Sequence, residues 1–329
     1  MSLSDKKVYL TRPIPEAGQN MLQQAFPLFK YNPDDDYVLS RDELLTAVKG
    51  MDGIVSLLTD KMDAEVMDAA GPQLKVIANY AVGYDNIDTR AATERGILVT
   101  NTPGVLTDAT ADFAWALLMA TARRISESER FSRALKYKAW GPKLLLGGDF
   151  VGRTLGIIGA GRIGAAFAKR SVGWNMRILY TDEMVNQELE NELGAKKVDL
   201  DTLLAQSDYV SIHVPLLPST HHLINAESLR KMKKTAYLVN TSRGPVVDEA
   251  ALAQALKEKV IAGAGLDVYE KEPEIHADLL DLENVVIAPH IASATLDTRD
   301  KMATMAASNC IAVLSGKKPE NLVNAEAWK

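Results

Sequence analysis

The chain has 329 residues, of which 47% are hydrophobic and 24% charged, as expected of a globular protein with enough core for two domains. Its 37 lysines and arginines and 43 aspartates and glutamates leave a net charge of −6, which argues against nucleic acid or an anionic membrane as the main partner. The single cysteine, Cys310, excludes an intramolecular disulfide and a cysteine-based metal cluster.

No secretory signal is visible at the start of the sequence. The most membrane-like run, residues 113–120, is far shorter than the roughly 18 residues that span a bilayer, so we interpret it as a buried helix. We therefore expect a cytoplasmic protein with no membrane partner.

The first hundred residues alternate short apolar stretches with helical patterns, which predicts a parallel sheet built from βαβ units. Residues 15–26 have the apolar spacing of a helix. Ser40 followed by Glu43 is typical of a capping box and predicts a helix over 40–48. The expected strands are 7–11, 53–58, 74–79 and 98–101.

A long helix is expected over 107–124, and the segment 136–149 has the glycine and proline content of a loop. A second alternation begins at Arg153, and a last helix is expected over 293–315. The expected strands of this second half are 154–158, 176–181, 209–213, 236–240, 262–266 and 285–288. The predicted fold class is α/β, with two Rossmann-like domains that each contain a parallel sheet.

A glycine-rich motif, Gly159-x-Gly161-x-x-Gly164, directly follows one predicted strand and opens a helix. In that context the glycines favour a tight turn, close approach to a pyrophosphate and close helix packing, which indicates dinucleotide binding. Asp182 follows Gly161 by 182 − 161 = 21 residues, at the end of the next strand. A carboxylate there can accept hydrogen bonds from ribose hydroxyls and would repel a 2′-phosphate, so NAD is predicted in preference to NADP.

Three further residues have the chemistry of a hydroxy-acid site. Arg243 lies just beyond a predicted strand end, where a guanidinium can hold a carboxylate bidentately. His290 also lies at a strand end, and histidine suits proton transfer near neutral pH. Glu272 precedes a proline, and a carboxylate beside a histidine would orient the ring. Spacing alone also allows each of the three to be an ordinary surface or loop residue.

The chain resembles the D-isomer-specific 2-hydroxyacid dehydrogenases, in particular their glyoxylate/hydroxypyruvate reductase branch. The resemblance covers nearly the whole chain in the family's order. Its matching segments are 78–88, 102–111, 156–164, the stretch around Arg243, 263–268 and Pro289-His290.

The resemblance implies roles for individual residues. His290 would be the general acid/base, Glu272 its partner and Arg243 the substrate anchor. The substrate would also meet the backbone N–H groups of Val82 and Gly83. Further substrate-binding residues implied by the resemblance are Leu58, Thr59 and Trp140. The implied cofactor-binding residues are Thr110, Gly159, Gly161, Arg162, Ile163, Gly164, Asp182, Val214, Pro215, Thr241 and Asp267.

The resemblance also implies a domain arrangement, with the active site in the cleft between the two domains. Residues 1–102 and 290–329 would form a discontinuous substrate domain, and 103–289 the NAD-binding Rossmann domain. A homodimer is expected, in which Trp140 either reaches the partner's active site or is a plain interface residue. No metal site is expected, because adjacent His221 and His222 have no third ligand nearby.

The expected reaction is NADH-dependent reduction of a small 2-oxo acid, with glyoxylate and hydroxypyruvate as leading substrates. A 2-ketogluconate-type reductase is an alternative of the same class. A second class stays open, because relatives of this fold serve as NAD-sensing corepressors that bind peptides and can keep the same three polar residues.

Overall fold

The computed structural model describes residues 2–328, which form two compact units. One unit extends to Leu106 and takes up the chain again from Ala294, and the other spans Thr107–Ser293. From the sequence we expect the second unit to end at residue 289, whereas it extends to Ser293 and so includes His290. The backbone N–H of His290 donates to the carbonyl of Asp267 in the same unit, at 2.9 Å. His290 therefore belongs with the glycine motif and not with the discontinuous unit.

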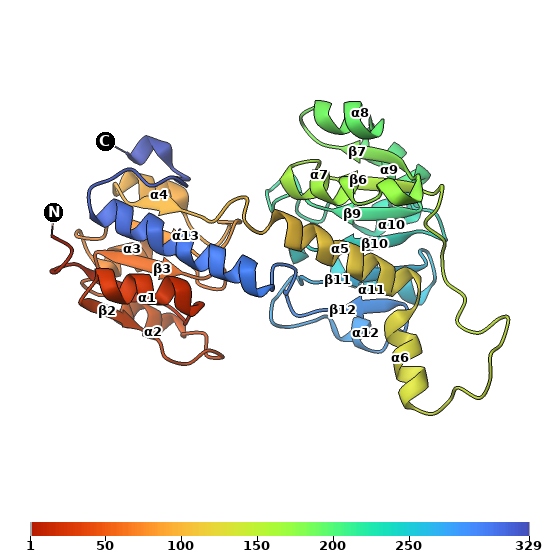
Figure 1. The fold of residues 1–329 in the computed structure, drawn as a ribbon, viewed down its shortest axis with the longest axis horizontal. Coiled ribbons are helices and arrows are strands. Elements are labelled where there is room, and N and C mark those ends of the chain that lie inside the picture. The colour runs from red at the N-terminus through yellow and green to blue at the C-terminus, as the bar shows by residue number, and fades with distance from the viewer. Residues whose placement is uncertain (1, 329) are drawn as a thin grey trace. The chain divides into compact units, whose positions relative to one another are not determined.

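The discontinuous unit is a five-stranded parallel sheet in the order β2-β1-β3-β4-β5 (Figure 1). Its two central strands, β3 and β4, are buried along their whole length, as expected of parallel strands covered on both faces. The strands are β1 (Lys7–Leu10), β2 (Leu28–Tyr31), β3 (Gly53–Ser56), β4 (Val76–Asn79) and β5 (Leu98–Thr100). The helices are α1 (Glu16–Ala25), α2 (Arg41–Ala47), α3 (Ala64–Ala70), α4 (Thr89–Glu94), α13 (Leu296–Leu314) and the 3₁₀ turn η3 (Ala325–Ala327).

The C-terminal part of the chain completes this unit, since α13 packs along α1 and against β3 and β4. The Tyr80 hydroxyl donates to the carbonyl of Arg299 on this helix at 3.1 Å. The predicted capping box is confirmed at Ser40, whose backbone and hydroxyl both bond Glu43. Strand β2 has no counterpart among the predicted strands, because it is an edge strand whose side chains are mostly exposed.

The second unit is a seven-stranded parallel sheet in the order β12-β11-β10-β9-β6-β7-β8 (Figure 1). The order reverses between β6 and β9, and the carboxyl ends of strands at such a switch point form the usual ligand site of an open α/β sheet. The strands are β6 (Thr154–Ile158), β7 (Arg177–Thr181), β8 (Lys196–Lys197), β9 (Tyr209–Ile212), β10 (Tyr237–Asn240), β11 (Gly263–Leu266) and β12 (Val285–Ile287). The prediction of an α/β fold with two parallel sheets is thus confirmed.

Helices cover both faces of this sheet, and each face has its own core. On one face, Trp115 of α5 stacks on Phe167 of α7 at 4.7 Å between ring centroids, and its indole N–H donates to the Phe167 carbonyl. Such an aromatic pair contributes about 1 kcal/mol beyond its buried area. The helices are α5 (Thr107–Ala122), α6 (Ile125–Arg133), α7 (Arg162–Lys169), α8 (Gln187–Leu193), α9 (Leu200–Gln206), α10 (Ala226–Lys231), α11 (Glu249–Lys257) and α12 (Ala277–Leu280), with 3₁₀ turns η1 (Val172–Trp174) and η2 (Gly244–Val246).

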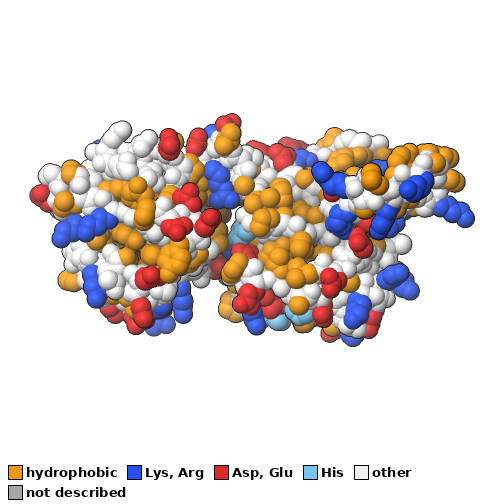
Figure 2. Space-filling view, turned by 90° about the horizontal axis from the view of Figure 1, so that it is seen from below, with side chains coloured by type: hydrophobic (Ala, Val, Ile, Leu, Met, Phe, Trp, Pro, Cys, Tyr) orange, Lys and Arg blue, Asp and Glu red, His pale blue; other side chains and the backbone are white. Residues whose placement is uncertain are grey.

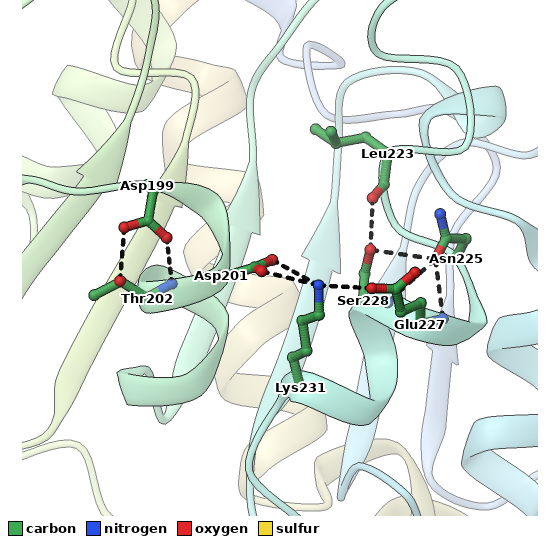
Figure 3. A network of polar contacts seen from close by, with 8 residues as sticks. All are labelled: Asp199, Asp201, Thr202, Leu223, Asn225, Glu227, Ser228 and Lys231. Atoms are coloured by element: carbon green, nitrogen blue, oxygen red, sulfur yellow. Dashed lines mark hydrogen bonds and ion pairs between the residues drawn. The ribbon is translucent and has the colours of Figure 1, made fainter.

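A polar network joins α9 to α10 on the opposite face (Figure 3). Asp199 and Asn225 cap the two helices by accepting backbone N–H groups. Lys231 bridges them, with Nζ 2.9 Å from both carboxylate oxygens of Asp201 and 2.9 Å from Glu227. The hydrogen bonds to these carboxylates raise the pKa of Lys231, and the contact with Asp201 links α10 to α9.

No helix within residues 2–328 is both long and apolar enough to cross a membrane.

Candidate functional site

The predicted site residues of the second unit lie where its strands end. The glycine motif follows β6, Asp182 follows β7, and Val214 follows β9. Arg243 follows β10, and His290 follows β12. Because all seven strands are parallel, these residues lie at the carboxyl ends of the strands, on one edge of the sheet. The glycine motif and Val214 flank the switch point between β6 and β9, whereas His290 follows the outermost strand, β12.

At each position of the motif, a different feature of the structure explains why the residue is glycine. Gly159 has φ +93°, and a Cβ there would lie 2.8 Å from the backbone of Val214. A Cβ on Gly161 would meet nothing within 4 Å, so its space is open to a ligand at the start of α7. A Cβ on Gly164 would lie 2.0 Å from the carbonyl oxygen of Gly159, so helix and strand end touch there. This cradle fits the pyrophosphate of a dinucleotide, with the N–H groups of Arg162 and Ile163 in the first turn of the helix.

Asp182 is tied into the same loop. Its Oδ2 accepts the backbone N–H of Ala160 at 2.7 Å, and Oδ1 accepts the N–H of Met184 at 3.1 Å. The Asn186 side chain donates to the Ala160 carbonyl at 2.7 Å. The carboxylate is thereby fixed beside the glycine turn, and each of its oxygens keeps a second lone pair for a ribose hydroxyl.

Other predicted lining residues lie on the same unit. Thr110 and Thr241 are both buried. The Thr241 hydroxyl oxygen has no hydrogen-bond partner within residues 2–328, which fits a polar group of a bound ligand. His213, just before Val214 and Pro215, packs against Phe167 with the two rings tilted and their centroids 5.1 Å apart. Its Nε2 lies 2.9 Å from the Ser211 hydroxyl. Burial lowers the pKa of His213 to about 3, so it is a neutral ring supporting the loop.

His290 and Glu272 form a pair. The His290 Nδ1 lies 2.8 Å from Glu272 Oε2, and both side chains keep about a quarter of their surface exposed. Because Nδ1 faces the carboxylate, Nε2 is the ring nitrogen that can exchange a proton with a substrate. The backbone of His290 has φ +55°, a conformation uncommon for a residue with a side chain.

The electrostatics of the pair favour the ionised carboxylate. Burial alone would raise the pKa of Glu272, but the hydrogen bond and charge of His290 outweigh it, helped by the Tyr269 N–H and the charge of Arg243. The pKa of Glu272 is therefore held below its ordinary value. Over most of the pH range His290 therefore faces a carboxylate anion.

Asp267 clamps the loop that carries His290. Its Oδ1 accepts the Ile291 N–H at 2.8 Å, and its Oδ2 accepts the Ala292 N–H at 2.7 Å. Burial raises the pKa of Asp267, although these two N–H groups oppose the shift. Together with the bond from the His290 N–H to its carbonyl, these contacts explain how the left-handed backbone at His290 is held.

Arg243 is held by its own turn. Its carbonyl accepts the Asn240 side-chain amide at 2.9 Å, and its Nη1 donates to the Ser242 carbonyl at 2.9 Å. The next residue, Gly244, lies directly under the loop bearing Glu272, since a Cβ there would sit 1.8 Å from the carbonyl carbon of Tyr269. Arg243 and Glu272 are therefore on segments packed backbone against backbone.

The remaining predicted residues lie elsewhere. Leu58 and Thr59 follow β3, where the Asp60 carboxylate accepts the Leu57 N–H at 2.8 Å. The carbonyls of Val82 and Gly83 accept the side-chain amides of Asn101 and Asn79, each at 2.8 Å. Trp140 is 80% exposed, in the segment between α6 and β6.

Three residues important to this geometry are not among the predicted ones. Tyr269 donates its hydroxyl to the Ala288 carbonyl at 2.7 Å, which ties the loop of Glu272 to the strand leading to His290. Gly244 admits that loop, and Glu249 contacts it from α11. Only the glycine after Arg243 offers a local sequence signal, because the other two act through long-range contacts.

Known proteins similar to this chain include members of one enzyme family, in sequence and in structure. The family model described as D-isomer specific 2-hydroxyacid dehydrogenase, NAD binding domain, matches residues 115–292. The chain is 56% identical over 325 residues to a glyoxylate reductase of Korarchaeum cryptofilum, covering 98% of this chain and 97% of that one.

Solved structures agree with this similarity. The TT0316 protein from Thermus thermophilus has a TM-score of 0.89 and 45% identity, covering 96% of this chain and 99% of its own. An NADPH-dependent glyoxylate/hydroxypyruvate reductase from Sinorhizobium meliloti, solved with NADP and malonate, has a TM-score of 0.85 and 33% identity, covering 98% of both chains.

Proposed function

The chain belongs to the D-isomer-specific 2-hydroxyacid dehydrogenase family, an oxidoreductase family with an NAD(P)-binding domain, and from this premise we propose that it reduces glyoxylate or hydroxypyruvate with NADH. The observation that carries the proposal is the contact between His290 and Glu272, 2.8 Å long, at the same edge of the sheet as the glycine motif. The full-length similarity to a glyoxylate reductase supports the choice of substrate class.

Each residue has a defined part in the proposed chemistry. We assign Arg243 to the substrate carboxylate, which a guanidinium can bind bidentately. We keep the backbone N–H groups of Val82 and Gly83 as further proposed substrate-binding groups, because an N–H group can donate to a carboxylate oxygen. Reduced nicotinamide, when bound, supplies a hydride to the carbonyl carbon. His290 Nε2 gives a proton to the carbonyl oxygen, and Glu272 stabilises the ring before that transfer. We assign Leu58 and Thr59 to the substrate's side chain, and Trp140 to that of the substrate in the partner subunit.

We expect NADH oxidation, followed by loss of nicotinamide absorbance, to be fastest with glyoxylate or hydroxypyruvate among a panel that includes 2-ketogluconate, pyruvate and phenylpyruvate. Glyoxylate has no side chain and hydroxypyruvate has only a hydroxymethyl group, so both need little space beyond the carboxylate anchor. A preference for 2-ketogluconate would replace the substrate class but keep the chemistry. Confirmed NADH binding without turnover of any acid would contradict the proposal and favour a binding protein.

The cofactor preference for NADH over NADPH rests on Asp182. The residues on either side, Thr181 and Glu183, bring no cation that could bind a 2′-phosphate. The Sinorhizobium relative is NADPH-dependent by name, so the family uses both cofactors and the preference belongs to individual chains.

We also propose a homodimer formed through the segment between α6 and β6. This segment loops away from the sheet of its unit (Figure 1), and Figure 2 shows hydrophobic side chains beside lysines and arginines on that projection. An exposed apolar group of this kind marks an interaction surface. Its exposed apolar members are Leu135, Tyr137, Trp140, Leu144, Leu146 and Val151.

Light scattering coupled to gel filtration should give twice the 35.9 kDa mass of the chain. Trp140→Asp should shift the protein towards the monomer, because it would place a charge in a desolvated interface. Leu28→Asp, at an exposed position of β2, is the matched control and should leave the mass unchanged. A monomeric parent protein at micromolar concentration would contradict the proposal.

A further inference from the structure

A buried carboxylate outside the catalytic pair contacts the loop that carries Glu272. Glu249 is the first residue of α11 and is only 5% exposed. Its Oε1 accepts the backbone N–H of Glu270, and its Oε2 accepts the N–H of His276 at 3.2 Å. In return, Glu270 Oε1 accepts the N–H of Glu249 at 2.9 Å. Helix and loop are therefore joined by three hydrogen bonds to two carboxylates.

The usual explanation of an acidic residue in a first helical turn is a solvated side chain that complements the helix dipole. Glu249 does not fit it, because the residue is buried and α11 is already capped by Asp248, which accepts the Ala251 N–H at 2.9 Å. Burial raises the pKa of Glu249, and the two loop N–H groups oppose that shift. A buried carboxylate is costly unless hydrogen-bonded, so its partners in the loop account for its presence.

The two residues that Glu249 holds, Glu270 and His276, bracket Glu272 in the sequence. Between them, Glu272 Oε1 accepts the Tyr269 N–H at 3.1 Å, while Oε2 meets His290. Glu270 Oε1 also lies 3.1 Å from His222 Nε2, so the loop has a second side-chain contact on the same side. The position of Glu272 relative to the sheet thus depends on both ends of the loop being fixed.

We propose that Glu249 is a positioning residue for the catalytic pair: it fixes the loop so that Glu272 meets His290 Nδ1. This inference rests on the proposed function for its catalytic consequence. Hydrogen-bonding partners that orient the ligands of metal sites typically change affinity or activity by about 10- to 100-fold when removed, and we expect the lower end of that range for the pair of His290 and Glu272.

Glu249→Ala is expected to lower kcat/KM for the 2-oxo acid about 10-fold and to move the acid limb of its pH profile to higher pH. The sign follows from Glu272, whose pKa His290 lowers: a displaced Glu272 loses that effect, its pKa rises, and it is protonated at a higher pH. Glu249→Gln, which keeps one acceptor oxygen, should show a smaller change in both quantities.

Two variants separate positioning from general damage to the fold. Glu258→Gln changes the C-cap glutamate of α11, whose side chain bonds only Gln254 in the described contacts, and should change neither rate nor profile. Adding Glu249→Ala to Glu272→Gln should cost nothing further in kcat/KM, because the group being positioned is already gone. A further 10-fold loss in the double variant would overturn the proposal.

A readout independent of turnover is the His290 Nδ1–H proton resonance, assigned by its loss in His290→Ala. We expect it to weaken or disappear in Glu249→Ala while persisting in Glu258→Gln. An unchanged resonance in Glu249→Ala would overturn the inference even if the rate falls. If His290→Ala and Glu272→Gln leave turnover unchanged but the resonance is lost in Glu249→Ala, the proposed function fails and the positioning role stands.

Discussion

Replacing His290 by alanine is expected to lower the turnover number for reduction of the 2-oxo acid by at least about 10²-fold, the usual contribution of a positioned general acid. Alanine cannot deliver a proton to the carbonyl oxygen as the hydride reaches the carbon, and water would have to replace the ring. NADH affinity, measured by fluorescence titration, should stay the same, because the residues proposed to hold the nucleotide lie on other segments of the sheet edge. Steady-state loss of NADH absorbance gives the turnover number.

His221→Ala is the matched control, since His221 is an exposed loop histidine outside the pair. Its turnover number should equal that of the parent protein. Glu272→Gln should give an intermediate loss, because the ring keeps a hydrogen-bond acceptor but loses the anion that stabilises its charged form. Parent-level turnover in His290→Ala would remove His290 from the mechanism and leave the pair a structural contact.

The strands that carry this chemistry could be predicted because their sequence pattern is local. Strands β3 and β4 are buried on both faces and apolar up to their last residues, Ser56 and Asn79. The glycine motif after β6 determines a turn by its own residues. Strand ends of a parallel sheet meet at one edge, so predicting β10 and β12 was enough to predict that Arg243 and His290 share that edge.

The unpredicted features depend on partners distant in sequence. Strand β2 has exposed side chains and is a strand only because β1 pairs with it. Helix α6 buries none of its residues and has only two apolar side chains, Ile125 and Phe131, too few to set the apolar repeat that marks a helix in the sequence. Glu249 meets its loop partner 21 residues away, and no local pattern distinguishes it from a solvated first-turn glutamate.

The left-handed backbone conformation of His290 is another feature that the local sequence does not predict. Neither Pro289 nor Ile291 indicates a positive φ, and a histidine rarely adopts one without support. The support comes from Asp267, 23 residues earlier, whose carbonyl and carboxylate together accept three N–H groups of the 290–292 loop. Sequence predicts the histidine's place at the strand end, and tertiary contacts decide where its ring points.

The cofactor preference should reverse when Asp182 is replaced by glycine and Glu183 by arginine. The double variant removes a carboxylate from the ribose position and adds a guanidinium that can bind a 2′-phosphate bidentately. Like charges placed together in a binding site cost several kcal/mol, and about 3 kcal/mol corresponds to roughly 10²-fold. We therefore expect the ratio of kcat/KM with NADPH to that with NADH to rise at least about 10²-fold, measured with one 2-oxo acid at fixed concentration.

Part of the change in kinetics comes from the hydrogen bonds that Asp182 makes within its own loop, and single variants can separate this part from the cofactor preference. Asp182 also accepts the N–H groups of Ala160 and Met184, so its loss loosens the glycine turn and should raise KM for both cofactors alike. Asp182→Asn keeps one acceptor oxygen and removes the charge, so it should shift the ratio with less effect on the shared KM. Glu183→Arg alone keeps the repelling carboxylate and should shift the ratio least. An NADH preference as strong in the double variant as in the parent would mean that another group excludes the 2′-phosphate, because neither charge nor space at position 182 would then oppose it.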